Sequence, residues 1–310
     1  MIVVCGEALM DLTASRLAGV DAYVARPGGG PYNISIGLGR LETPVAFLGR
    51  VSRDPFGERL RARLRASHVS DRYLREGAEP TTLALVHGEP DREPEFAFYT
   101  NGTADRLLVP ADLPDRLPAE VAGIHFGSLS LVLEPGASTL EGLMAREHGR
   151  RLVSLDPNVR PAVIPDRAAY LGRLERWLPS VDLVKVSRAD LAWLHPGEPL
   201  DDAARRWLDR GPALVVVTHG ADGAVGFTAA DEVRVEGVRV TVADTVGAGD
   251  AFMSGLLARL HQRRLLERLR LRGLGADLAD ALRYAVRVSA LTCTRAGAEP
   301  PTRAELDAFA

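Results

Sequence analysis

The sequence predicts an α/β fold in which a mostly parallel central sheet is covered by helices on both faces. Short runs rich in Val, Ile and Leu alternate with segments of helical spacing along the 310 residues. Such apolar runs are typical of strands buried on both faces, and the alternation is typical of parallel sheets. Because no long linker, repeat or low-complexity tract interrupts this order, we expect a single α/β domain over residues 1–310.

Six strands and six helices follow from these patterns. The predicted strands are Ile2–Cys5, Val45–Leu48, Ile124–Phe126, Leu152–Leu155, Leu183–Val186 and Leu214–Thr218. The predicted helices are Pro31–Leu41, Phe56–Ala66, Ser138–His148, Ala168–Leu178, Ala203–Leu208 and Ala251–Leu260. We expect the ligand crevice to lie beyond the carboxyl ends of the strands, as in other open α/β sheets.

Two segments, residues 12–27 and 81–100, depart from the alternation of strands and helices. Both carry alternating or broken apolar patterns with Pro and Gly, and neither has convincing helical spacing. These patterns favour antiparallel strands outside the main sheet. We expect the two segments to form a small β lid over the ligand crevice.

Composition argues against several functional classes. The net charge is −3 and charged residues make up 25% of the chain, so nothing predicts a nucleic-acid partner, which needs a strong basic patch. No apolar run is long enough to span a bilayer, and the arginine- and leucine-rich stretch 258–275 favours a solvated helix end over a membrane-surface helix. Cys5 and Cys293 lack metal-binding spacing, so we expect reduced thiols in a cytoplasmic protein.

The segment Asp244–Phe252, with the sequence DTVGAGDAF, carries the main chemical signal. Gly247, Ala248 and Gly249 leave backbone amides uncovered, and the following helix adds unpaired N–H groups and its positive dipole end, which together suit a phosphoryl group. Asp250 is either a helix cap or a base that accepts the proton of a substrate hydroxyl. The helix dipole should keep it ionised at neutral pH. The absence of GxxxxGK[ST] excludes a P-loop kinase.

This segment resembles the C-terminal signature of the PfkB, or ribokinase-like, carbohydrate kinases. The resemblance implies a ribokinase-like three-layer α/β sandwich with a small β lid. It also implies that Gly247, Ala248 and Gly249 form an anion hole and that Asp250 is the catalytic base.

The glycine cluster GGGPYN at residues 28–33 precedes the first predicted helix. By itself it is equally typical of a flexible loop followed by a helix start. It resembles the N-terminal PfkB signature, which implies that Gly28, Gly29 and Asn33 hold the sugar. Asp11 matches the family's sugar-binding Asp, whereas Glu7 in the same stretch is ambiguous and also suits a role in satisfying backbone groups.

Three further segments resemble the fructokinases of this family. They are FYTNGTAD at residues 98–105, HFGSLSL at 125–131 and DPNVR at 156–160. Arg160, from the last segment, binds either the substrate or the transferred phosphate, or else is a salt-bridged surface residue. Thr100 and Val286 depart from the pattern, since relatives usually have Arg and Asn at these places.

The expected nucleotide and metal contacts lie in three other segments. VTHGADGA at residues 217–224 resembles the family's TxGxxG turn, although it also suits a plain hairpin. KVSRAD at 185–190 occupies the place of the family's NxxE element, from which Asp190 would reach magnesium through water. Asp244 matches a residue that helps bind a monovalent cation, which makes potassium an additional candidate. The residues expected to contact ATP are Lys185, Ser187, Thr218, Gly220, Gly223 and Thr245.

Together these residues predict an ATP-dependent sugar kinase that transfers the γ-phosphate of MgATP to a hydroxymethyl group, with fructose as the first choice. A 2-keto-3-deoxygluconate kinase, another sugar or nucleoside kinase of the family, and a non-catalytic sugar or nucleotide sensor stay open as alternatives. A dinucleotide-binding dehydrogenase is excluded because GEAL, not GxGxxG, follows the first strand. The expected partners are a sugar and ATP, and a homodimer through the lid is a further expectation.

Overall fold

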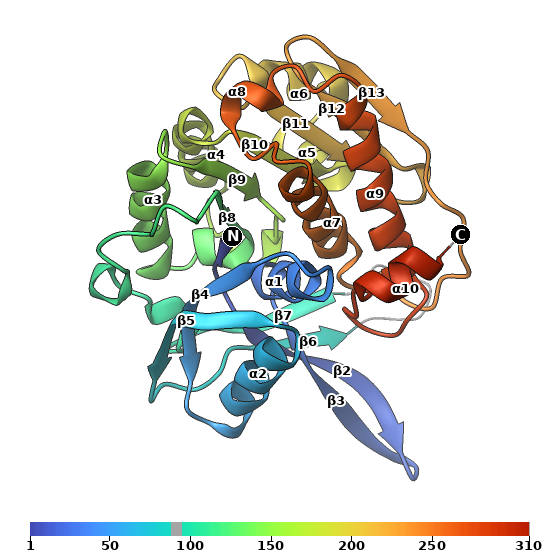
Figure 1. Ribbon diagram of the computed structural model, residues 1–310. Helices are drawn as coiled ribbons and strands as arrows, with labels where there is room; N and C mark the ends of the chain where they lie inside the picture. Colours follow the sequence, from blue (N-terminus) through green and yellow to red (C-terminus); the bar gives the residue numbers. More distant parts are fainter. Residues whose placement is uncertain (88–94, 310) are drawn as a thin grey trace.

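The computed structural model describes residues 1–87 and 95–309, which contain a nine-stranded and a four-stranded sheet. The larger sheet has the order β13-β12-β11-β10-β9-β8-β1-β4-β5 (Figure 1). Only the β11–β12 and β12–β13 pairs are antiparallel. The six predicted strands are therefore confirmed as its parallel centre. The strands are β1 (Ile2–Cys5), β4 (Val45–Ser52), β5 (Val69–Gly77), β8 (Gly123–Gly127), β9 (Leu152–Asp156), β10 (Leu183–Ser187), β11 (Leu214–Thr218), β12 (Ala224–Phe227) and β13 (Glu232–Val235).

Helices cover both faces of this sheet and create two hydrophobic cores (Figure 1). The first face carries α1 (Gly30–Arg40), α2 (Pro55–Ala66), α7 (Ala248–Gln262) and α9 (Ala276–Cys293), and the second carries α3 (Gly136–Glu147), α4 (Arg167–Trp177), α5 (Arg188–Leu194) and α6 (Leu200–Leu208). Two short helices, α8 (Arg268–Leu271) and α10 (Arg303–Ala308), pack near the first group. The predicted three-layer sandwich is confirmed.

Strand β1 shows why two cores form. Ile2 and Val4 belong to the first core, whereas Val3 and Cys5 belong to the second. Successive side chains of a strand point to opposite faces of its sheet, so a strand without polar residues needs a helical layer on each side. The continuous apolar runs of the sequence thus dictate the three layers.

Capping residues determine where the helices begin. Asp54 accepts a hydrogen bond from the amide of Gly57 at 2.8 Å, and Pro55 follows with a φ suited to the first helical position. Helix α7 begins differently, because its capping residue is Gly247, whose φ of 76° favours glycine, and no side chain of the described residues caps it. Asp250 is therefore not the cap of this helix.

The smaller sheet has the order β3-β2-β6-β7 and lies outside the main sheet (Figure 1). Its strands are β2 (Leu9–Leu17), β3 (Val20–Gly28), β6 (Leu83–His87) and β7 (Glu95–Tyr99). Residues 88–94 of the predicted lid segment 81–100 lie outside the described residues. The β2–β6 pair is parallel, which corrects the expectation of antiparallel strands throughout. The reason is that the chain passes through β3, α1, β4, α2 and β5 between these two strands, so no tight hairpin joins them.

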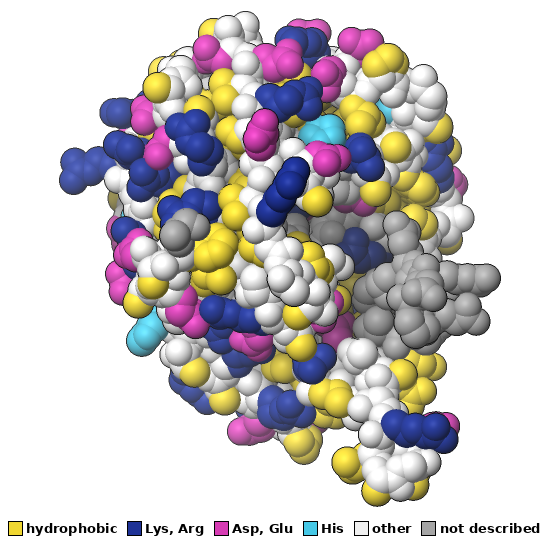
Figure 2. All heavy atoms as spheres, turned by 90° about the vertical axis from the view of Figure 1, so that its right-hand side faces the viewer, with side chains coloured by type: hydrophobic (Ala, Val, Ile, Leu, Met, Phe, Trp, Pro, Cys, Tyr) yellow, Lys and Arg dark blue, Asp and Glu magenta, His cyan; other side chains and the backbone are white. Residues whose placement is uncertain are grey.

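The β2–β3 hairpin projects from the body and has a partly hydrophobic surface. Leu17 and Val20 at its tip are 74% and 68% exposed, and Figure 2 shows hydrophobic side chains on this projection. Acidic and basic side chains are interspersed over the rest of the face drawn there. Among the described helices, none is both long enough and apolar enough to cross a lipid bilayer.

Candidate active site

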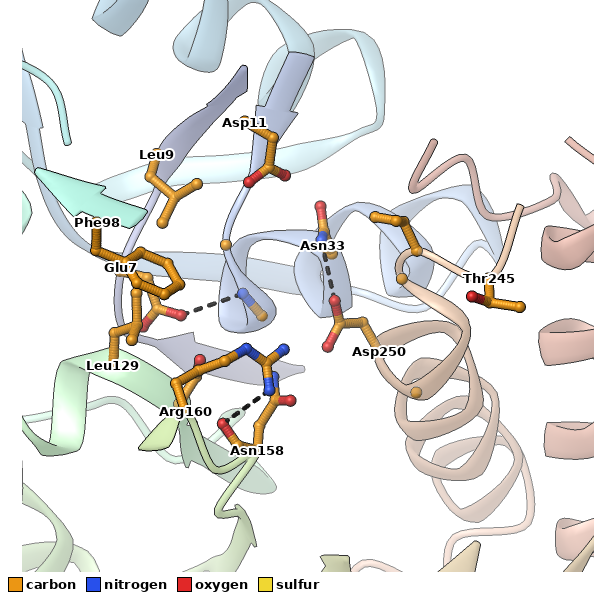
Figure 3. Close-up of a pocket in the computed structure, with 16 residues that line it drawn as sticks. Glu7, Leu9, Asp11, Asn33, Phe98, Leu129, Asn158, Arg160, Thr245 and Asp250 are labelled. Atoms are coloured by element: carbon orange, nitrogen blue, oxygen red, sulfur yellow. Dashed lines mark hydrogen bonds between the residues drawn. The ribbon is translucent and has the colours of Figure 1, made fainter. Parts of the chain in front are cut away.

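A cavity of about 260 Å³ lies between the four-stranded sheet, the loops that follow β8 and β9, and the first turns of α1 and α7 (Figure 3). Its position agrees with the predicted crevice beyond the carboxyl ends of the strands. Six widely separated stretches of chain contribute polar and apolar groups to it. The lining residues are Glu7, Leu9, Asp11, Gly29, Gly30, Asn33, Phe98, Ser128, Leu129, Asn158, Arg160, Thr245, Val246, Gly247, Gly249 and Asp250.

Asp250 lies in the first turn of α7 and faces this cavity (Figure 3). The residue is 9% exposed, and its Oδ2 accepts a hydrogen bond from Nδ2 of Asn33 at 2.9 Å. Burial raises the pKa of Asp250 to about 6, while the Asn33 hydrogen bond and the charges of Lys185 and Arg160 oppose this rise. With its pKa at about 6, most of this carboxyl is ionised at pH 7. Such a group is suited to accept a proton.

The turn before α7 presents backbone amides beside this carboxylate. The amide of Ala248 donates to the carbonyl oxygen of Thr245 at 3.2 Å, so it is engaged inside the turn. The amides of Gly249 and Asp250 stand at helix positions that have no carbonyl partner one turn earlier. Together with the positive end of the helix dipole, these two amides make a site suited to an anion.

Asp11 faces the cavity from β2 (Figure 3). Gly28 makes room for its side chain. A Cβ on Gly28 would lie 2.0 Å from Oδ2 of Asp11, so a larger residue would displace this carboxylate. Burial raises the pKa of Asp11 to about 7, the charge of Asp250 adds to the rise, and Arg160 lowers it. The carboxylates of Asp11 and Asp250 therefore share the cavity with the guanidinium of Arg160.

Glu7 and Gly29 build the turn that opens α1. Oε1 of Glu7 accepts from the amide of Gly30 and Oε2 from the amide of Ser130, each at 3.1 Å. Gly29 has a φ of 108°, and a Cβ there would lie 2.9 Å from the carbonyl oxygen of Glu7. Although burial raises the pKa of Glu7 to about 7 and the residue reaches the cavity, its contacts favour the backbone-satisfying role.

Arg160 points into the cavity and an apolar patch lines another part of it (Figure 3). Nη1 of Arg160 donates to the carbonyl oxygen of Asn158 at 3.2 Å. This location favours a ligand-binding role over that of a salt-bridged surface residue. The apolar patch consists of Leu9, Phe98 and Leu129. Carboxylates, an amide and a guanidinium beside an apolar patch suit the hydroxyl groups and C–H faces of a sugar.

Two polar residues of the lining, Ser128 and Asn158, are absent from the sequence-based prediction of the site. Their φ angles of 62° and 41° are positive, which is uncommon for residues other than glycine. Each follows the carboxyl end of a strand, Ser128 after β8 and Asn158 after β9. The signal that could have identified them is a polar residue just beyond a predicted buried strand.

The residues predicted to bind the nucleotide lie mostly outside this cavity, at neighbouring strand ends. Ser187 and Thr218 are aligned in the register of β10 and β11. Oγ of Ser187 accepts from the amide of Asp190 at 3.0 Å and caps α5, and burial raises the pKa of Asp190. Lys185 links these strand ends to the turn before α7, because a Cβ on Gly249 would lie 3.1 Å from its Nζ.

The turn between β11 and β12 belongs to an antiparallel hairpin with two glycines at positive φ. A Cβ on Gly223 would lie 2.1 Å from the carbonyl oxygen of Val235, so the approach of β13 requires glycine there. A Cβ on Gly220 would meet open space among the described residues. The plain-hairpin alternative thus accounts for both glycines, for Gly223 through the approach of β13 and for Gly220 through its positive φ of 60°.

Asp244 holds the loop after α9 against the turn before α7. Its Oδ2 accepts from the amide of Gly297 at 2.7 Å and its Oδ1 from the amide of Val246 at 3.0 Å. The two departures from the family pattern lie outside the cavity lining: Val286 is buried in the first core, and the carbonyl oxygen of Thr100 accepts from Oγ1 of Thr103 at 3.0 Å.

Comparison with known proteins explains this arrangement. A sequence model described as pfkB family carbohydrate kinase matches residues 1–305. The chain belongs to this family. A fructokinase of Rhizobium leguminosarum bv. trifolii is 42% identical to this pfkB kinase over 270 residues, which cover 86% of the chain and 81% of the relative.

Solved structures agree with this membership and confirm the predicted fold class. A fructokinase with bound ATP from Xylella fastidiosa has a TM-score of 0.90 at 28% identity, with 99% of this chain and 97% of that chain covered. A fructokinase from Vibrio cholerae O395 in a fructose-, ADP- and calcium-bound form has a TM-score of 0.86 at 30% identity, with 99% and 98% covered. This pfkB kinase is a phosphotransferase with an alcohol group as acceptor.

Proposed function

We propose that this pfkB kinase transfers the γ-phosphate of MgATP to a hydroxymethyl oxygen of fructose. The observation that carries the proposal is the position of Asp250, which is buried beside uncovered helix amides and faces a polar cavity. Similarity to fructokinases, one of which is bound to fructose and ADP in its structure, supports fructose as the sugar.

In the proposed reaction, Asp250 accepts the proton of the sugar hydroxyl while the hydroxyl oxygen attacks the γ-phosphorus. A bond forms between that oxygen and the phosphorus, and the bond from the phosphorus to the bridging oxygen breaks, so ADP leaves with the electron pair. The amides of Gly249 and Asp250 and the positive end of α7 stabilise the charge on the transferring group. Gly247 and Ala248 shape the turn that presents these amides.

The sugar is proposed to bind between the apolar patch and the carboxylates. Asp11, Asn33 and Arg160 are assigned to its hydroxyl groups, because all three line the cavity. Gly28 and Gly29 permit this arrangement, since larger residues would displace Asp11 or the backbone of the turn. Leu9 and Phe98 would pack against C–H groups of the ring.

The nucleotide is assigned to the ends of β10 and β11, next to the anion site. These strand ends lie next to Lys185, whose Nζ is close to Gly249 of the anion site. ATP bound there would supply the phosphoryl group to the anion site. Ser187, Thr218, Gly220, Gly223 and Thr245 are the remaining residues assigned to ATP.

Magnesium and potassium are proposed as accompanying ions. No three His, Cys, Asp or Glu side chains gather as a metal site in the described part of the chain, which fits a magnesium ion held mainly by phosphates and water, with Asp190 reached through water. Bound magnesium would neutralise phosphate charge. Asp244 orders the loop at Gly297, where we place potassium.

The four-stranded sheet is proposed to act as a lid and as a dimer contact. It contributes Asp11 and Phe98 to the cavity, so its closure would exclude water. The exposed Leu17 and Val20 at its tip would be buried by a second copy of the chain. Changing both to Ser should convert the dimer to a monomer in light scattering, whereas a monomeric wild type would remove this proposal.

We place the protein in the cytoplasm, where both free cysteines would stay reduced.

The proposal is tested by following ADP release with purified protein, MgATP and either fructose or 2-keto-3-deoxygluconate. We expect turnover on fructose and its loss on chelation of magnesium. Turnover on the keto acid alone would favour the second candidate, for which Arg160 could pair with the substrate carboxylate. No product from any sugar would favour a sensor.

A further inference from the structure

The side chain of Asn33 contacts the proposed base directly. Its Nδ2 donates to Oδ2 of Asp250 at 2.9 Å in a buried contact. Since an ionised carboxylate only accepts hydrogen bonds, the amide nitrogen must face it. Oδ1 of Asn33 is buried, has no hydrogen-bond partner among the described residues and points away from Asp250 (Figure 3). The second carboxylate oxygen of Asp250 is directed into the cavity (Figure 3).

The packing of two helices holds this contact in place. Asn33 and Gly37 stand one turn apart on α1, and Asp250 and Ser254 stand one turn apart on α7. A Cβ on Gly37 would lie 2.3 Å from Oγ of Ser254, so the helices approach closely directly below the Asn33–Asp250 hydrogen bond. Ser254 is itself fixed, because its Oγ donates to the carbonyl oxygen of Ala251 at 2.8 Å. The distance between donor and base is therefore set by core packing.

We propose that Asn33 is a positioning residue for the base: its amide holds Oδ2 of Asp250 so that the other carboxylate oxygen faces the substrate hydroxyl. Resting on the proposed kinase reaction, this role is additional to sugar binding, which uses Oδ1 of the same side chain. A carboxylate held at one oxygen loses rotational freedom and presents its proton acceptor in one direction.

The Asn33 amide also favours the ionised form of Asp250, as a donor to a carboxylate does. Other elements place further charged groups around this carboxylate, so its titration reflects all of them. Burial is the largest influence and raises its pKa. The charged groups are Asp11 on β2, Asp156 on β9, Arg160 after β9 and Lys185 on β10.

Asn33→Asp separates positioning from sugar binding. This variant keeps the size of the side chain and an acceptor oxygen for the sugar, but it loses the N–H donor and adds a like charge. We expect the single-turnover rate of phosphoryl transfer at pH 7, measured by rapid quench, to fall about 100-fold, the size of a lost acid–base contribution. The apparent pKa of the acid limb in its pH–rate profile should rise by about one unit or more, because Asp250 has lost the hydrogen-bond donor that favours its ionised form. The KM for fructose should change less than the rate does.

Two further variants keep the test decisive if Asn33→Asp folds poorly. Gly37→Ala forces α1 away from α7 without touching Asn33 or Asp250, and Ser254→Gly restores the lost space. We expect Gly37→Ala to lower the single-turnover rate about 10-fold and to raise the apparent pKa of the acid limb. The double variant with Ser254→Gly should recover the wild-type rate and the wild-type apparent pKa. Ser35→Ala, which removes a hydroxyl that donates to the carbonyl oxygen of Tyr32 on the same helix, is the matched control with an unchanged profile.

The proposal is overturned if Asn33→Asp raises the KM for fructose while the rate and the acid limb stay at wild-type values. It is also overturned if Gly37→Ala keeps the wild-type profile. A wild-type protein without turnover on any sugar would instead refute the proposed kinase function, so the two failures are distinguishable.

Discussion

Nζ of Lys185 lies 2.8 Å from Oδ2 of Asp156 in an ion pair that is buried directly behind Gly249. Lys185 is the only lysine of the chain. Its ammonium group is fixed beside the anion site by a carboxylate on the neighbouring strand, so it can add positive charge to the site without moving. We propose that it contributes to the charge that stabilises the transferring phosphoryl group.

Replacement of this lysine should separate catalysis from stability. Lys185→Met should slow phosphoryl transfer about 100-fold by removing a fixed charge, with little change in the KM for fructose. It should also destabilise the fold by about 3–5 kcal/mol, because Asp156 is left as an unpaired buried charge. Adding Asp156→Asn should restore the unfolding temperature but not the rate. Wild-type rates in the single variant would remove Lys185 from the reaction.

A methyl group at Gly28 should weaken sugar binding. Gly28→Ala places a Cβ where Oδ2 of Asp11 now lies, so the carboxylate must turn away. The KM for fructose should rise roughly 10- to 100-fold, as expected when a hydrogen bond from a ligand to a charged group is lost. Gly142→Ala is the matched control, because a Cβ there has no neighbour within 4 Å among the described residues. Equal kinetics for the two variants would contradict the assigned role of Asp11.

Activity should fall as the pH is lowered through the range 6–7. Burial raises the pKa of Asp250 to about 6 and that of Asp11 to about 7, and the charge of Asp250 adds to the rise at Asp11. A base must be ionised, so protonation at low pH removes it; kcat/KM should show an acid limb whose apparent pKa belongs to the pair. Asp11→Asn should shift this limb to lower pH because one negative charge is gone. An unchanged limb would show that the two carboxyl groups do not interact.

The sequence was sufficient to predict the parts of the fold that depend on continuous apolar runs. Strand β1 needs no polar residue on either face, so its burial between two helical layers can be read from Ile2–Cys5 alone. The start of α7 was placed too late, at Ala251 instead of Ala248, since Gly247 and Gly249 obscure the first turn. The parallel pairing of β2 with β6 could not be predicted either, because strand pairing across a long crossover leaves no local pattern in the sequence.

The site divides in a similar way. Asp250 and the glycines around it were found because they stand next to one another in a specific signature. The hydrogen bond between Asn33 and Asp250 could not be predicted from the sequence, because it joins residues 217 positions apart that helix packing brings together. Likewise, the requirement for glycine at 28 became clear only once Asp11 was placed beside it.

Asp250→Asn should fold and be more stable than the wild type above pH 6. The folded-state pKa of Asp250 is raised, so its ionisation opposes folding as the pH rises through about 6, and a neutral amide removes this cost. The gain should be on the order of 1–3 kcal/mol at pH 8, measured by denaturant unfolding. A less stable variant would show that the carboxylate is better solvated than its burial indicates.

The most direct test of the account is the rate of fructose-dependent ADP formation by Asp250→Asn at saturating MgATP and pH 7.5. We expect kcat to be lower than that of the wild type by about two to four orders of magnitude, with binding of fructose and ATP retained, because only the proton acceptor is lost. Turnover close to that of the wild type would contradict the assignment of Asp250 as the base.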